Sequence, residues 1–129
     1  MDRKNFCMIF FTFLLITVVF SACKIHSVHT VTISEFNLAD YQWSIEKFPY
    51  KGKVEPIYSA EKAIYTANNL WLSKFGEDAV YKENEVEVLY DFEHDCWLVK
   101  GLLPPNTLGG SPNFLCKKDG EILAIWHEM

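Results

Sequence analysis

WLVKGLLPPNTLGG, from Trp97 to Gly110, is the run around which this sequence is organised. Its first residues alternate between two faces of an extended backbone, with Trp97 and Val99 on one face and Leu98 on the other. This strand should end near Leu103, because the two prolines that follow cannot donate hydrogen bonds to a neighbouring strand. The two closing glycines favour a chain that turns back into a sheet. The run contains no acid, nucleophile or metal ligand.

A second strand is predicted at residues 86–92, where apolar and mostly acidic residues alternate. The inward positions are Val86, Val88, Tyr90 and Phe92, and the outward positions are Glu85, Glu87, Leu89 and Asp91. Glu93, His94 and Asp95 form the turn into the next strand. The pattern therefore predicts a half-buried strand with an acidic outer face.

Two further strands, 113–118 and 121–126, are joined by Asp119-Gly120, a dipeptide typical of a type I′ hairpin. A two-residue loop sets the pairing of the whole hairpin. The predicted pairs are Lys118 with Glu121, Cys116 with Leu123, and Phe114 with Ile125.

Residues 59–75 form the clearest helix, because their apolar side chains recur at spacings of three and four. Ser59 is a natural N-cap and Gly76 is placed for the C-terminal cap. Residues 34–48 fit either a helix or a strand, and a helix capped by Ser34 is preferred. The predicted class is α+β: one or two N-terminal helices packed on a curved antiparallel sheet of about four strands.

The N-terminus has the pattern of a bacterial secretion signal, with Arg3 and Lys4 ahead of an apolar run that ends at Phe20. This run is shorter than the ~20 apolar residues of a spanning helix. The ending FSAC resembles a lipobox, so Cys23 is the expected lipidated first residue of an exported lipoprotein on the periplasmic side of the envelope. A plainly cleaved signal and a retained anchor helix are the alternatives. The predicted division is a signal at 1–22, a tether and poorly defined N-terminal segment at 23–57, and a domain at 58–129.

The formal net charge is −5, which argues against nucleic acid as a partner. Acidic residues crowd the region around the second strand, as either a solvated edge or a docking face for a basic partner. The candidate partner-binding residues are Glu83, Glu85, Glu87, Asp91, Glu93 and Asp95.

Candidate chemistry is sparse. The cluster DFEHD, Asp91 to Asp95, mixes carboxylates with an imidazole, but a polar turn exposed to solvent explains it better than a metal or proton-transfer site. Cys96 and Cys116 are predicted at the same end of neighbouring strands, and either pair as a disulfide or stay buried as free thiols. We expect no catalytic residue, no metal and no cofactor.

Four motifs carry a resemblance to a known family: AIYTANNLWLSKFGE (63–77), DCWLVKGLLP (95–104), LGG (108–110) and KKDGEILAIWH (117–127). In this order they resemble bacterial immunity proteins with a nuclear-transport-factor-2-like, cone-shaped fold, which are found beside polymorphic toxins. The resemblance implies a non-enzymatic protein that binds a cognate toxin domain and neutralises it. The alternative is an envelope lipoprotein that uses the same fold as a pocket for a small ligand or for enzymatic chemistry, with Tyr65, Tyr90 and His127 as the polar candidates.

Overall fold

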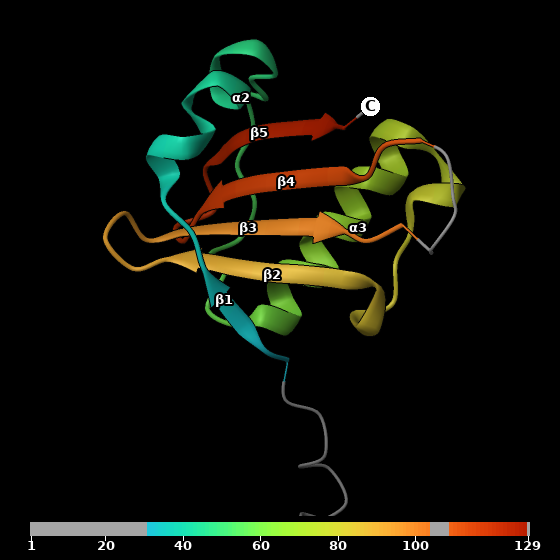
Figure 1. The fold of residues 1–129 in the computed structure, drawn as a ribbon, viewed down its shortest axis with the longest axis horizontal. Coiled ribbons are helices and arrows are strands. Elements are labelled where there is room, and N and C mark those ends of the chain that lie inside the picture. Colours follow the sequence, from blue (N-terminus) through green and yellow to red (C-terminus); the bar gives the residue numbers. More distant parts are fainter. Residues whose placement is uncertain (1–30, 104–108, 129) are drawn as a thin grey trace, which may run out of the picture. The chain divides into compact units, whose positions relative to one another are not determined.

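The computed structural model describes residues 31–103 and 109–128 (Figure 1). The predicted signal at 1–22, the lipidation site Cys23 and most of the proline loop after the third strand lie outside the described residues. Among the helices that the structure describes, none is both long and apolar enough to span a membrane.

A five-stranded sheet forms the centre of the fold, in the order β1-β2-β3-β4-β5 (Figure 1). The strands are β1 (Ile33–Glu35), β2 (Val86–Asp91), β3 (Cys96–Gly101), β4 (Pro112–Lys117) and β5 (Ile122–His127). The last four are antiparallel neighbours, which confirms the predicted strands and the α+β class. The fifth, β1, was not predicted, and it pairs in parallel with β2.

Helix α3 (Ala60–Phe75) packs on one face of the sheet, as its apolar stripe predicts (Figure 1). Ser59 Oγ accepts a hydrogen bond from Lys62 N–H at 3.2 Å, and Gly76 ends the helix with φ of 97°. Both predicted caps are thus confirmed. The buried side chains on this face include Ala63, Ala67, Trp71, Val88, Trp97, Val99, Phe114 and Ile125. The short helices η2 (Glu77–Ala79) and η3 (Glu83–Glu85) connect α3 to β2.

The opposite face of the sheet is covered by the N-terminal segment, through η1 (Leu38–Tyr41) and α2 (Gln42–Lys47). The helix predicted for residues 34–48 is therefore only partly correct: Ser34 belongs to β1, and Asn37 caps η1 by accepting from Ala39 N–H. Its predicted apolar stripe nevertheless packs together on the sheet as Leu38, Tyr41, Ile45 and Phe48. The predicted domain start at residue 58 is too late, because β1 and α2 belong to the same packed unit.

The β4–β5 hairpin differs from its prediction near the tip. Phe114 faces Ile125 as expected, but Cys116 faces Ile122, and Lys117 rather than Lys118 forms the ion pair with Glu121, at 3.1 Å. A type I′ turn needs positive φ at both central residues, and only Gly120 (φ 101°) has it. The loop consequently has three residues, closed by the 2.9 Å bond from Gly120 N–H to Lys117 O, and the pairing shifts by one beyond Leu115.

Cys96 and Cys116 are both buried free thiols. They lie at the same end of neighbouring strands, as predicted, but Cys116 is opposite Trp97 and Cys96 is opposite Lys117. Because successive residues of a strand point to opposite faces, the two thiols lie on different sides of the sheet. The disulfide alternative is therefore wrong for this structure. Burial raises the pKa of Cys96 to about 11 and that of Cys116 to about 12, so neither is a thiolate nucleophile at neutral pH.

Candidate functional site

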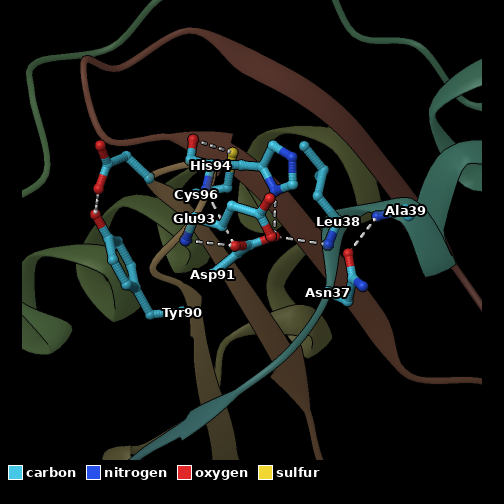
Figure 2. A network of polar contacts seen from close by, with 9 residues as sticks. Asn37, Leu38, Ala39, Tyr90, Asp91, Glu93, His94 and Cys96 are labelled. Atoms are coloured by element: carbon cyan, nitrogen blue, oxygen red, sulfur yellow. Dashed lines mark hydrogen bonds and ion pairs between the residues drawn. The ribbon is translucent and has the colours of Figure 1, made fainter.

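The turn between β2 and β3 is built around the buried carboxylate of Asp91, whose exposed fraction is 4% (Figure 2). Its Oδ1 accepts hydrogen bonds from Glu93 N–H at 2.9 Å and His94 N–H at 3.1 Å. Its Oδ2 accepts from Leu38 N–H at 2.7 Å and lies 2.8 Å from His94 Nδ1. Since a carboxylate can only accept, Nδ1 carries the proton in this contact. Asp91 thus ties the N-terminal segment to the turn.

The electrostatics of this cluster stabilise the charged forms of both partners. Burial alone would raise the pKa of Asp91, but the hydrogen bonds from Leu38, His94 and Glu93 outweigh it and lower the pKa to about 2. The hydrogen bond to Asp91 raises the pKa of His94 above its usual range. The pair is a structural clamp, because Asp91 has its oxygens occupied by the protein's own donors.

The next residue of the turn, Asp95, is held in an uncommon backbone conformation with φ of 51°. Its carboxylate accepts a 2.8 Å hydrogen bond from the Tyr90 hydroxyl. Burial, followed by this hydrogen bond, raises the pKa of Tyr90 to about 12. Tyr90 therefore stays neutral and works as a fixed donor that orients Asp95 at the surface.

Two adjoining grooves open beside this turn. The larger, about 370 Å³, is lined by Tyr58, His94, Asp95, Lys117, Lys118 and Asp119. The second, about 270 Å³, is lined by Ile33, Tyr58, Tyr90, Phe92, Asp95, Trp97 and Lys118. Tyr58, Asp95 and Lys118 line both, so we treat the two as one surface, the hairpin-end groove. It lies where the β2–β3 and β4–β5 turns meet the start of α3.

The predicted partner-binding acids do not form one face. Glu83 and Glu85 lie in η3 and Glu87 on β2, next to the start of that strand, whereas Glu93 and Asp95 lie in the turn after its end. Asp91 does take the outward side of β2 as predicted, but the N-terminal segment covers it, so it offers no carboxylate to a partner. The prediction of Asp91 as a partner-binding residue is wrong for this reason.

Sequence reasoning missed the two exposed aromatic residues of the groove. Phe92 was predicted to point into the core, but β2 ends at Asp91 and the Phe92 side chain is 67% exposed. Tyr58, just before the helix cap, is 75% exposed. The sequence shows an aromatic residue before a helix and another in a polar turn, but no local pattern indicates that the two line the same groove.

The residues suggested for a small-ligand or enzymatic pocket are scattered. Tyr65 projects from α3 into a groove with Lys62 and Leu70, Tyr90 donates to Asp95, and His127 packs edge-on against Phe75. In the described part of the chain, no three His, Cys, Asp or Glu residues are grouped to hold a metal.

The C-terminal half of the chain matches a known protein family. Residues 62–129, just over half of the chain, match the model of a family described as NTF2 fold immunity protein. The chain belongs to this family. The match confirms the resemblance and the nuclear-transport-factor-2-like fold expected from the motifs. No curated protein and no solved structure matches the chain.

The family match covers most of α3 and the strands β2 to β5 of this immunity protein. It leaves out β1, η1, α2 and Tyr58. The hairpin-end groove of the immunity protein therefore combines residues inside the matched region, such as Phe92 and Asp95, with residues ahead of it.

Proposed function

We propose that this immunity protein neutralises a cognate toxin by binding it directly, without catalysis. The observation that carries the proposal is the family match across α3 and four of the five strands. The hairpin-end groove supports it, because exposed aromatic residues surrounded by charges are typical of protein interfaces. A binding protein of this kind acts stoichiometrically, so each molecule of it blocks one molecule of toxin.

The stoichiometry of protection tests this proposal. Toxin activity should fall linearly as the full chain is added and vanish near one equivalent, with the mass of the toxin unchanged. Complete inactivation by a small fraction of an equivalent, or a new covalent mass on the toxin, would mean that the protein acts as an enzyme. The toxin to use is the C-terminal domain encoded by the neighbouring reading frame.

We further propose that the protein acts in the cell envelope as a lipoprotein anchored at Cys23. The support is the basic head, apolar run and FSAC ending at the N-terminus. Deleting residues 1–22 should abolish protection of the cell, although the purified variant still binds the toxin. Cys23→Ala should remove the lipid mass from the membrane fraction. Equal protection by the deleted form, or an unmodified Cys23 in the membrane fraction, would refute the proposal.

A further inference from the structure

We propose that the hairpin-end groove is the toxin-binding surface, and that its occupant is an arginine side chain on an exposed segment of the toxin. This inference rests on the proposed function and names the part of the protein that performs it. Three properties of the groove support it: a prearranged aromatic wall, carboxylates without a salt bridge, and an exposed tyrosine ring over which a cation already lies.

The aromatic wall is held in place by the fold. The Phe92 ring packs edge-on against Tyr90 with centroids 4.9 Å apart, and Tyr90 packs in the same way against Trp97 at 4.6 Å. Trp97 is anchored in turn by a 2.9 Å hydrogen bond from its Nε1 to Ile57 O. Because these side chains are already ordered in the free protein, little of their conformational entropy is lost when a partner binds.

The charges around the groove are unevenly matched. His94 is paired with Asp91 and Lys117 with Glu121, while Lys118 Nζ lies 5.9 Å from the centre of the Tyr58 ring. Of the charged residues that line the groove, Asp95, Asp119 and Lys118 have no ion-pair partner among the described residues. The groove therefore presents two carboxylates without a salt bridge beside exposed aromatic rings, and Lys118 opposes them.

Arginine is the side chain that can bind both the aromatic rings and the carboxylates of the groove. Its planar guanidinium stacks on aromatic rings and also donates to a carboxylate, whereas the lysine ammonium is a compact, strongly hydrated charge. Asp95 and Tyr58 each line both parts of the groove, so they present a carboxylate and an aromatic ring to the same occupant. Lys118 competes for the same place, since it already lies over Tyr58.

Calorimetry tests the inference. The full chain, purified in mild detergent, is titrated against the C-terminal toxin domain encoded by the neighbouring reading frame. Tyr58→Ala and Asp95→Asn should each weaken binding about tenfold, the size expected for a stacked or charge-assisted contact. Asparagine tolerates the positive φ of position 95 and keeps an acceptor for Tyr90. Lys118→Ala should strengthen binding several-fold, because it removes the competing cation.

Matched controls lie elsewhere on the protein. Tyr65→Ala removes an aromatic side chain of α3 that is 62% exposed, and Glu46→Gln removes an exposed acid of α2, which packs on the other face of the sheet. Both should leave the affinity unchanged. If Tyr58→Ala and Asp95→Asn bind as tightly as the wild type, or if the controls weaken binding equally, the groove is not the toxin-binding surface. The proposed function would then still stand. No binding by the wild type would overturn both.

A double-mutant cycle tests the arginine itself. Each exposed arginine of the toxin domain is replaced by alanine and measured against wild type and Asp95→Asn. For one of these arginines, the alanine replacement should weaken binding much less against Asp95→Asn than against the wild type, because the arginine and Asp95 interact directly. Independent effects at every arginine would overturn the assignment of the occupant.

Discussion

Replacement of Asp91 by alanine is expected to lower the free energy of unfolding by about 3 kcal/mol. The change removes a buried acceptor and leaves the N–H groups of Leu38, Glu93 and His94 without their partner. It also releases the N-terminal segment from the β2–β3 turn. Urea unfolding followed by tryptophan fluorescence measures the loss. Glu87→Ala, an exposed acid on the same strand, is the matched control and should stay within about 0.5 kcal/mol of the wild type.

The stability of the clamp also depends on pH, with opposite signs for its two partners. The pKa of Asp91 is lowered on folding from 3.8 to about 2, so its contribution is present above pH 4 and is lost as the pH falls toward 2. The pKa of His94 is raised above 6.5, so its contribution is present at lower pH and is lost as the pH rises through the raised value. The gap between wild type and Asp91→Ala should therefore shrink in acid. A gap that is constant down to pH 2 would contradict the clamp.

Replacement of Gly120 by alanine is expected to cost about 4 kcal/mol of unfolding free energy. Gly120 has φ of 101°, which disfavours any side chain, and a Cβ there would collide with the backbone oxygen of Val54. The collision would break the 2.8 Å hydrogen bond from Val54 N–H to Gly120 O, which holds the segment before α3 against the hairpin. Thermal unfolding of the variant measures the loss.

Gly76→Ala separates the two causes of this loss. Gly76 has a similar φ of 97°, but a Cβ there would meet no atom of the described residues within 4 Å beyond its chain neighbours and its own helix. Its replacement should cost only the backbone strain, about 2 kcal/mol. Equal losses for the two variants would show that the contact with Val54 contributes nothing.

The elements with a strong local period could be predicted from the sequence. The alternation of Val86, Val88 and Tyr90 placed them on the α3 side of β2, and the stripe of residues 59–75 predicted α3 with both of its caps. The hairpin was predicted correctly up to Phe114 and Ile125. Its tip was not, because Asp119-Gly120 fits both a two-residue loop and the three-residue loop that forms, and the contact of Gly120 with Val54 favours the second.

The site depended on contacts that no local pattern contains. The sequence correctly put Asp91 on the outward side of β2, but Leu38, 53 residues earlier, covers that side and turns an expected surface acid into a buried clamp. In the same way, Tyr58 and Phe92 are 34 positions apart and line one groove only because the start of α3 lies beside the β2–β3 turn. The period of a strand determines the face on which a side chain lies. Whether that face is buried or open to a partner is decided by segments distant in the chain, and therefore only by the tertiary structure.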